Sequence, residues 1–344
     1  MLAGLSRALV FALAIAPAAV QAQAQQLEKV TFATNWVAEA EHGGFYQALV
    51  DGTYRKAGLD VTILPGGPNV NHRLQLLAGK IQFYMSANSI QAFDAAGQNI
   101  PTLVVASMFQ KDPQALFARP GGAIRDFADL AHAPVAWIAK DAQFTWWQWL
   151  KAEHGFRDAQ LRPYAYNLGP FLADPRSIQQ GYAVEEPIAI ERQGGFRPLT
   201  FLLADHGFST YSTLIEAREE TVRARPELVQ RFVDASIIGW VNYLYGDRRA
   251  GDALILRDNP DMRPETIAGS VALMKELGIV DSGDAHTLGI GAMRPERVRD
   301  FLDKMVRAGL YRPGEVDPAR AVTTRFVNRG VGGELAERVK GKRP

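Results

Sequence analysis

Short β-type runs alternate with helical patterns along much of this chain, and this alternation restricts the possible folds more than any other feature. The runs occupy residues 30–33, 61–64, 81–85 and 103–106, and then 115–118, 135–138, 161–166 and 199–203. Strands that alternate with helices form βαβ units, in which neighbouring strands run parallel and helices cover the sheet. With 344 residues, the chain has room for two domains of ordinary size. We therefore predict an α/β fold with two lobes, each a mostly parallel sheet flanked by helices.

The later part of the chain predicts how the lobes are connected. Residues 211–215 form one more β-type run, after which the pattern is almost wholly helical. The predicted helices cover 226–245, 248–257, 264–277 and 295–308, and several begin at a proline. Packing these helices on the first lobe makes the chain cross twice between the lobes. The alternative is two tandem domains followed by an independent helical domain.

The predicted boundaries follow from junctions near Lys111-Asp112-Pro113 and Asp205-His206-Gly207. Lobe 1 is discontinuous and comprises residues 25–112 and 207–330, including the C-terminal helices. Lobe 2 comprises residues 113–206, and residues 331–344 form a C-terminal tail.

The N-terminal residues have the order of a secretory signal peptide. One charge, Arg7, precedes the apolar run 8–20, and small-x-small cleavage candidates follow at 20–22 and 22–24. The run is shorter than the roughly 20 apolar residues that span a bilayer, which argues against a membrane anchor. We predict that residues 1–24 are a signal peptide, and that the mature chain is periplasmic and not embedded in a membrane.

Composition and motifs exclude several classes of function. Lys and Arg number 38 against 37 Asp and Glu, so no basic excess exists to neutralise a nucleic acid. The absence of cysteine excludes disulfides, thiolate metal sites, cysteine nucleophiles and lipid attachment through cysteine. HExxH, GxSxG and Walker motifs are absent, and the six histidines are scattered. We therefore predict a monomeric binding protein that is not an enzyme and has no cofactor and no metal site.

The segments that follow the predicted strands supply a candidate ligand site, because ligands of open α/β sheets bind at the carboxyl ends of the strands. These segments are rich in aromatic, amide and carboxylate side chains. Aromatic faces stack on a flat heteroaromatic ring, while amides and carboxylates bond to its edge. The candidate ligand-binding residues are Asn35, Trp36, Glu41, His42, Ser86, Asn88, Gln110, Phe144, Trp146, Tyr182, Glu185 and Glu186.

Trp36 and Glu186 are the strongest of these candidates, and each has a structural alternative. Trp36 is instead a core residue if it lies under the first loop, and Glu186 is a helix N-terminal carboxylate favoured by the helix dipole. Trp146 and Trp149 share a helix face, so at least one of them is expected in the core. A lone histidine such as His42 is more often a hydrogen-bonding or capping residue than a base.

Two neighbouring stretches carry a resemblance to a known family. They are residues 35–48 (NWVAEAEHGGFYQA) and 54–61 (YRKAGLDV), with further similar segments at 65–68, 76–79, 110–113 and 185–187. The chain resembles the periplasmic substrate-binding proteins of ABC importers in the sulfonate, nitrate and thiamine-pyrimidine-precursor group. The resemblance covers essentially the whole mature chain, and the run formed by residues 42–48 and 57–61 is fairly specific to the pyrimidine branch.

The resemblance implies a type II periplasmic binding protein fold with a double chain crossover. A ligand is then trapped between the lobes by hinge closure and delivered to an ABC permease. In the pyrimidine branch an aminopyrimidine stacks on aromatic rings and a carboxylate reads its edge, and these roles fall on Trp36 and Glu186. Two alternatives stay open: a binder of an aliphatic sulfonate or similar small anion, and a pyrimidine-synthesis enzyme on the same fold. The acidic Asp141 loop argues against the anion, and the lack of cysteine against the enzyme, whose relatives carry a cysteine-rich motif.

Overall fold

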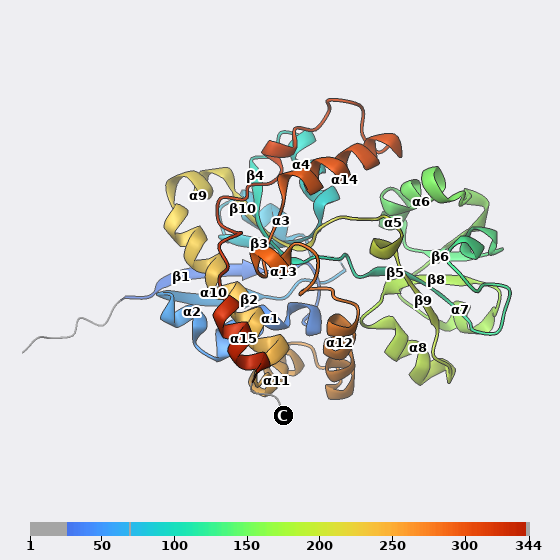
Figure 1. Cartoon of the computed structure of the whole chain (residues 1–344), viewed down its shortest axis with the longest axis horizontal. Coiled ribbons are helices and arrows are strands. Elements are labelled where there is room, and N and C mark those ends of the chain that lie inside the picture. Colours follow the sequence, from blue (N-terminus) through green and yellow to red (C-terminus); the bar gives the residue numbers. More distant parts are fainter. Residues whose placement is uncertain (1–25, 69, 342–344) are drawn as a thin grey trace, which may run out of the picture.

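Two five-stranded sheets form the framework of the protein (Figure 1). The structure is a computed structural model that describes residues 26–68 and 70–341, so the predicted signal peptide, residues 1–24, lies outside the described residues. The strand order is β2-β1-β3-β10-β4 in the first sheet and β7-β6-β8-β5-β9 in the second. The predicted α/β class is confirmed.

The first sheet is built from strands at both ends of lobe 1 in the sequence. Its strands are β1 (Glu28–Ala33), β2 (Leu59–Leu64), β3 (Phe83–Asn88), β4 (Thr102–Phe109) and β10 (Ser212–Arg218). β1 pairs parallel with β2 and β3, whereas β10 lies antiparallel between β3 and β4. The second sheet contains β5 (Gln114–Ala118), β6 (Ala136–Ile138), β7 (Leu161–Pro163), β8 (Ile178–Tyr182) and β9 (Leu199–Leu202). There β5 is the reversed strand, between β8 and β9.

In each sheet, the antiparallel strand is the first strand that the chain enters after it crosses from the other sheet. The chain leaves β4 and enters the second sheet through β5, and it returns through β10 after the short helix η4 (Leu203–His206). Asp112 joins the two crossings, because its carboxylate accepts hydrogen bonds from Asn88 Nδ2 (3.1 Å) and from the backbone N–H of Gln114 (2.9 Å). It also bonds to the Ser212 side chain, and its burial raises its pKa to about 6. The lobe boundaries assigned from the sequence stay a prediction.

Helices cover both sheets. Around the first sheet lie α1 (Gly43–Val50), α2 (Thr53–Lys56), α3 (His72–Leu77), α4 (Ser89–Gly97), α9 (Glu219–Ala224), α10 (Pro226–Tyr245), α11 (Arg249–Asp258), α12 (Pro264–Glu276), α13 (Ala285–Leu288), α14 (Pro295–Arg307) and α15 (Gly333–Lys340). The second sheet carries α5 (Lys140–Gln143), α6 (Trp146–His154), α7 (Gly169–Ala173) and α8 (Glu186–Gly194). Short 3-10 turns are η1 (Ala40–His42), η2 (Ala128–His132), η3 (Asp158–Gln160) and η5 (Pro318–Arg320).

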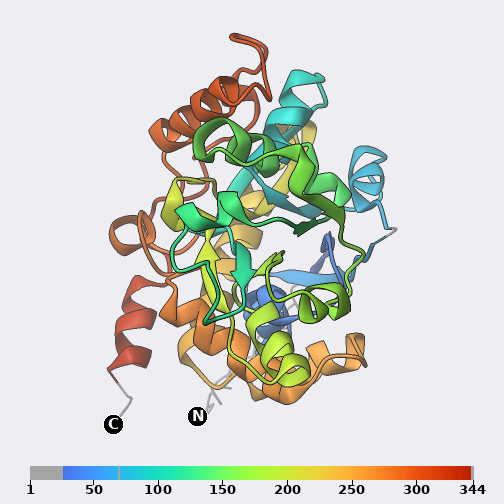
Figure 2. The same ribbon diagram turned by 90° about the vertical axis from the view of Figure 1, so that its right-hand side faces the viewer.

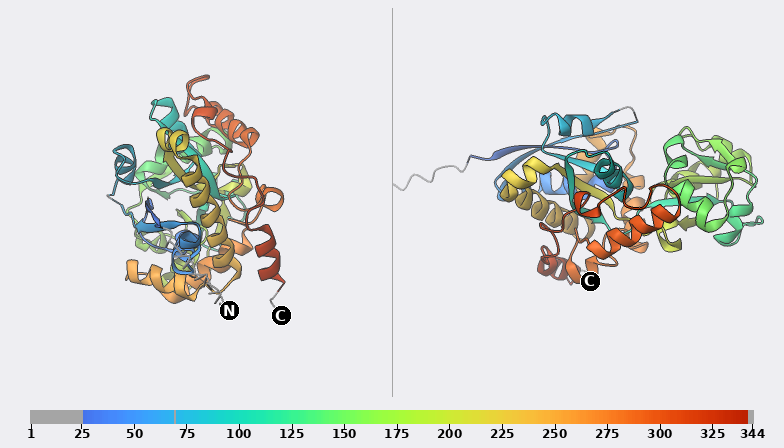
Figure 3. Two further views of the ribbon diagram at one scale, coloured as in Figure 1. Left: turned by 90° about the vertical axis from the view of Figure 1, so that its left-hand side faces the viewer. Right: turned by 90° about the horizontal axis from the view of Figure 1, so that it is seen from above.

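The C-terminal helices pack back on the first sheet and its helices, as the helical pattern predicted. α10 lies against α1 and β4, and α15 packs on α10 (Figure 1). Two of these helices also reach the other lobe, since α12 contacts α8 and α14 contacts α6. The second lobe lies at one end of the molecule, as the view from above shows (Figure 3). Viewed from that end, it lies in front of the first lobe (Figure 2). Among the described residues, no helix is both long and apolar enough to cross a bilayer.

The sequence pattern missed β8, the central strand of the second sheet. Its sequence, IQQGY, lacks an apolar run, yet Gln179 is fully buried. Hydrogen bonds make this burial possible: Gln179 Nε2 donates to the Gln180 carbonyl (2.7 Å), and Gln180 Oε1 accepts from the backbone N–H of Ala139 (2.6 Å). Gln179 Oε1 has no partner among the described residues, so the pairing is partial, and a polar strand of this kind has no signature in hydropathy.

Glycines allow α1 and α10 to pack at backbone contact. A Cβ on Gly239 of α10 would lie 2.2 Å from the Gly44 carbonyl oxygen, and a Cβ on Gly44 would lie 2.2 Å from the Trp240 ring. Because one of these neighbours is backbone, no side-chain rotation relieves the first clash. This contact fixes α1 and the loop before it, which carries several candidate site residues.

We expect Gly239→Ala to lower the free energy of unfolding by about 1–3 kcal/mol, because an added methyl group must push α1 away from α10. Gly333→Ala is the matched control, since nothing lies within 4 Å of a Cβ there. The control should stay within about 0.5 kcal/mol of the wild type. Urea denaturation measures both, and equal stabilities of the two variants would contradict the close-packing argument.

Candidate functional site

The loop after β1 presents candidate residues at the carboxyl end of the first sheet. It is held against the loop after β2: the backbone N–H of Gly66 donates to the Trp36 carbonyl (2.9 Å), and Thr34 Oγ1 donates to the same oxygen (2.8 Å). Gly66 is required here because a Cβ would lie 2.5 Å from the Thr34 carbonyl oxygen. The sharp approach of the two loops fixes Trp36, which is partly buried, at the side of the first lobe that meets the second.

A row of aromatic rings connects the two lobes. The Trp36 ring lies 5.4 Å from the Tyr166 ring, centroid to centroid, at an interplanar angle of 41°. Tyr166 in turn lies 5.3 Å from the Tyr164 ring. Tyr164 and Tyr166 follow β7 in the second lobe, and Tyr166 has a φ of 57° and a side chain 59% exposed. A non-glycine residue in this strained region, next to an interlobe contact, is typical of a functional site.

Four glutamates meet beside this aromatic row. Glu39 and Glu41 come from the η1 segment of the first lobe, and Glu185 and Glu186 come from the start of α8 in the second. Glu39, Glu41 and Glu185 each offer one carboxylate oxygen, and these three oxygens lie within 4.8 Å of one another. We call these three residues the interlobe carboxylate triad. The Glu39 and Glu185 carboxyl groups lie within hydrogen-bonding reach of each other, a contact that favours a proton or a cation between them.

Burial and mutual repulsion keep these carboxyl groups from all being charged. Burial, followed by the charges of neighbouring glutamates, raises the pKa of Glu39 well above its ordinary value. The pKa of Glu41 is raised well above its ordinary value for the same reasons, and burial also raises that of Glu185. Four acidic groups in one desolvated site therefore attract protons or another positive charge.

Glu186 and Tyr182 form the wall of the site on the second lobe. One Glu186 carboxylate oxygen accepts a hydrogen bond from the backbone N–H of Tyr182 (2.6 Å). The carboxyl group packs on Gly181, where a Cβ would lie 2.4 Å from it. Burial, with the charge of Glu185, raises the pKa of Glu186 to about 8. Burial also raises the pKa of Tyr182 well above its ordinary value, with added contributions from Asp112, Glu39, Glu41 and Glu186.

Several buried polar atoms near the first-lobe strand ends have no hydrogen-bond partner among the described residues. They are Asn35 Oδ1, Glu41 Oε1, His42 Nδ1 and Ser86 Oγ. Burial lowers the pKa of His42 to about 3, so its imidazole is neutral at physiological pH. Unpaired buried polar groups are uncommon in folded proteins, because each loses its hydrogen bonds to water. Their concentration at these strand ends indicates a surface that binds a polar partner.

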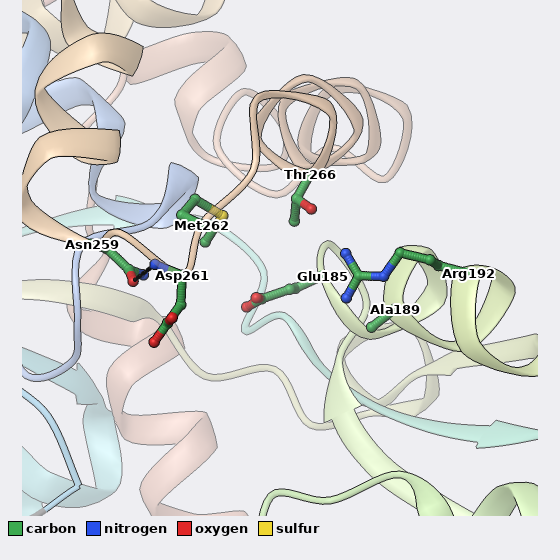
Figure 4. Close-up of a pocket in the computed structure, with 7 residues that line it drawn as sticks. All are labelled: Glu185, Ala189, Arg192, Asn259, Asp261, Met262 and Thr266. Carbon is green, nitrogen blue, oxygen red and sulfur yellow. Dashed lines mark hydrogen bonds between the residues drawn. The ribbon is translucent and has the colours of Figure 1, made fainter.

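A pocket opens beside the carboxylate triad, between the lobes (Figure 4). Glu185, Ala189 and Arg192 line it from the second lobe, and Asn259, Asp261, Met262 and Thr266 line it from the first. Its volume of about 140 Å³ is below the range of roughly 300–1,000 Å³ usual for drug-sized ligands. Asn259 connects it to the β1 loop, since its Nδ2 donates to the Ala38 carbonyl (2.8 Å). The pocket is therefore the outer edge of the site rather than a complete ligand cavity.

The part of the chain that carries the four glutamates also shows its family. A family model described as "NMT1/THI5 like" matches residues 39–246, which include all four glutamates. The chain belongs to this family. Among curated proteins, the riboflavin-binding protein RibY of Chloroflexus aurantiacus is 23% identical over 272 residues, which cover 77% of this chain and 75% of RibY.

Solved structures share the fold at low sequence identity. The nitrate-binding protein NrtA of Synechocystis PCC 6803 has a TM-score of 0.60 and 14% identity, covering 91% of this chain and 89% of NrtA. The aliphatic sulphonate binding protein SsuA of Escherichia coli has a TM-score of 0.57 and 12% identity, covering 86% of this chain and 92% of SsuA. Both proteins are described as periplasmic binding proteins. Because the chain shares their fold, it has a type II periplasmic binding protein fold. The family resemblance noted in the sequence is confirmed at this level.

The structure brings part of the predicted site together. Trp36, Glu41, Tyr182, Glu185 and Glu186 converge between the lobes. Asn35 and His42 belong to the same loop, and Ser86 and Asn88 lie on β3, where Asn88 caps α4 by accepting from the backbone N–H of Ile90 (3.1 Å).

Three other predicted residues have surroundings that do not point to a ligand. Gln110 is buried, and its amide is already bonded, donating to the Ala292 carbonyl (2.9 Å) and accepting from Arg297 (3.4 Å). Phe144 has a side chain 69% exposed, and Trp146 is buried in the apolar core. Ligand contacts by these three side chains stay a prediction.

The candidates chosen from the sequence did not include three residues of the aromatic row and the glutamate group: Glu39, Tyr164 and Tyr166. Residues 161–166 were predicted as one strand, but β7 ends at Pro163, and the two tyrosines therefore lie in a loop. Proline has no N–H to donate to a sheet, and this signal at residue 163 could have ended the predicted strand there.

We expect the raised pKa of Glu186 to make the protein less stable as pH rises. The folded state keeps a proton that the unfolded chain releases near its ordinary value, so stability is lost between about pH 4.5 and about pH 8. Glu186→Gln cannot lose this proton, and its amide oxygen can still accept from Tyr182. Thermal melts across this range should show a smaller fall in Tm for Glu186→Gln than for the wild type. The exposed Glu191→Gln on α8 should follow the wild type, and a wild-type pH slope in Glu186→Gln would contradict the assignment.

Proposed function

We propose that this chain is a periplasmic solute-binding protein that captures a small heteroaromatic ligand, similar to a thiamine-pyrimidine precursor, between its lobes and delivers it to an ABC permease. The observation that carries the proposal is the row of aromatic rings and the four glutamates assembled from both lobes. Because each lobe supplies part of the site, a ligand bound there favours the closed arrangement of the lobes.

Trp36 and Tyr166 are the proposed stacking surfaces for the ring. They contact each other directly at 5.4 Å, so a flat ring enters by separating them, and a rotation of one lobe at the two crossings supplies that movement. Ring stacking contributes roughly 0.5–1.5 kcal/mol beyond the burial of apolar area. Tyr164 extends the aromatic surface on the second lobe.

Glu186 is the proposed reader of the ring edge. Its raised pKa gives a protonated carboxyl group at neutral pH, which can donate to a ring nitrogen and accept from a neighbouring amino group. A more basic aminopyrimidine takes the proton, and the contact becomes charge-assisted. Asn35, Glu41, His42 and Ser86 offer further polar atoms, of which His42 is neutral.

The ligands named for similar proteins fall into two classes, a heteroaromatic compound and small anions. Riboflavin, the ligand in the name of RibY, contains a flat heteroaromatic ring system and is a second candidate of the same class. The sulphonate and nitrate binding proteins similar in fold favour an anion instead. A cluster of four carboxyl groups offers an anion no positive charge and gains repulsion wherever one of them ionises, so the site favours the heteroaromatic ligand over the sulfonate alternative. One ligand site per chain suits a monomer that acts alone.

A ligand screen tests the proposal directly. We expect an aminopyrimidine that matches the pyrimidine half of thiamine, or riboflavin, to raise the Tm and to change tryptophan fluorescence. At 100 times its Kd, a ligand stabilises the folded state by about 2.7 kcal/mol, which a thermal shift detects. Taurine and nitrate should have no effect. A response to taurine or nitrate alone would overturn the proposal in favour of an anion binder.

The role of Trp36 has a separate test. Because Trp36 is partly buried and lies at the lobe contact, we expect Trp36→Ala to keep its fold and to bind the active ring at least about tenfold more weakly. Leu74→Ala is the control, an apolar truncation on α3 at a side chain 62% exposed. Isothermal titration compares the affinities. Wild-type affinity in Trp36→Ala, or an equal loss in Leu74→Ala, would exclude Trp36 as the stacking residue.

A further inference from the structure

We propose that the interlobe carboxylate triad of Glu39, Glu41 and Glu185 binds a hard divalent cation, with Ca²⁺ preferred, and that this ion connects the two lobes. The site is adjacent to the proposed ligand site but does not depend on which organic ligand binds there. It assigns a second, inorganic partner to the same closed arrangement.

The spacing of the three oxygens fits such an ion. All three lie within 4.8 Å of one another. Oxygen ligands of Ca²⁺ lie roughly 2.3–2.6 Å from the ion, so two of them are separated by at most about 5 Å. One ion can therefore contact Glu39, Glu41 and Glu185 at once, without any movement of the backbone elements that carry them.

An unpartnered oxygen on one residue of the triad points independently to a positively charged partner. The Glu41 side chain is 3% exposed, and its Oε1 has no hydrogen-bond partner among the described residues. Glu39 is similarly buried, at 5%. A buried carboxylate oxygen without a donor is the kind of atom that a bound cation satisfies.

The surrounding charges compensate the triad only in part. Arg192 lies on the pocket wall beside Glu185 and favours its charged form. Within the part of the chain that the structure describes, however, no lysine or arginine forms an ion pair with Glu39, Glu41 or Glu185. The neighbouring groups Glu186 and Asp112 are also acidic. A divalent ion therefore supplies positive charge that reaches all three carboxylates.

The donor set and its access select the class of ion. Carboxylate oxygens alone, without histidine or cysteine, favour Ca²⁺ and Mg²⁺ over softer metals. Mg²⁺ demands a tighter, octahedral set and keeps its water, which three glutamates from two lobes suit less well. The pocket beside Glu185 gives the ion access, and its charged lining residues are Glu185 and Asp261 with Arg192 (Figure 4).

Isothermal titration of chelator-treated protein with CaCl₂ tests the site, with thermal melts as a second measurement. We expect one Ca²⁺ per chain, a rise in Tm, and weaker binding of Mg²⁺. Glu41→Gln keeps the size of the side chain and should weaken Ca²⁺ binding at least about tenfold. The exposed Glu191→Gln should bind Ca²⁺ like the wild type. Circular dichroism verifies that both variants fold, and Glu39→Gln replaces Glu41→Gln if that variant does not.

The absence of heat and of thermal shift with Ca²⁺ and Mg²⁺ would overturn the proposal, as would equal Ca²⁺ affinity in Glu41→Gln and the wild type. Binding of Zn²⁺ alone would also overturn it, because it would indicate softer ligands elsewhere. The organic-ligand screen is run with and without Ca²⁺. Aminopyrimidine or riboflavin binding without any cation binding would refute the cation site and leave the proposed function intact, whereas the reverse result would refute only the function.

Discussion

Glu39 and Glu185 lie on different lobes, and their carboxyl groups are close enough to share a proton. Two carboxylates taken out of water repel each other strongly unless a proton or a cation lies between them. The arrangement of the lobes is therefore coupled to whatever positive charge occupies this contact. The Trp36 and Tyr166 rings also meet between the lobes, and this contact between two neutral rings has no such requirement.

The double crossing explains how these groups reach one place. Each sheet receives the chain through its reversed strand, β5 or β10, and the carboxyl ends of the parallel strands then face the other lobe. Asp112 holds the crossings together through Asn88, Gln114 and Ser212. The backbone contact of Gly44 with Gly239 fixes α1, and with it the η1 segment that carries Glu41.

Periodicity predicted much of this framework, and it failed where side chains pair locally. The strands of the first sheet and the helices α10, α11, α12 and α14 occur close to their predicted ranges, because apolar spacing and N-terminal prolines mark them. β8 was missed because Gln179 and Gln180 are buried through hydrogen bonds, which leave no apolar pattern. Trp36 and Glu186 were found because they follow strands in the sequence. Glu39 and Tyr166 were missed because each is close to a residue of the opposite lobe, Glu185 or Trp36, and these contacts form only when the two lobes meet.

Proton, cation and ring compete for the same negative charge in this site. A proton shared by Glu39 and Glu185 satisfies two oxygens but leaves Glu41 Oε1 unpaired. A divalent ion at the triad satisfies all three residues and releases that proton, so cation binding strengthens as pH rises. A basic ring that takes the Glu186 proton leaves a carboxylate behind, so the ring and Glu186 together gain no net charge. Linkage requires these effects to be reciprocal: whatever Ca²⁺ does to ring affinity, the ring does equally to Ca²⁺ affinity. A ring and an ion that both bind between the lobes favour the same closed arrangement, so each is expected to strengthen the binding of the other.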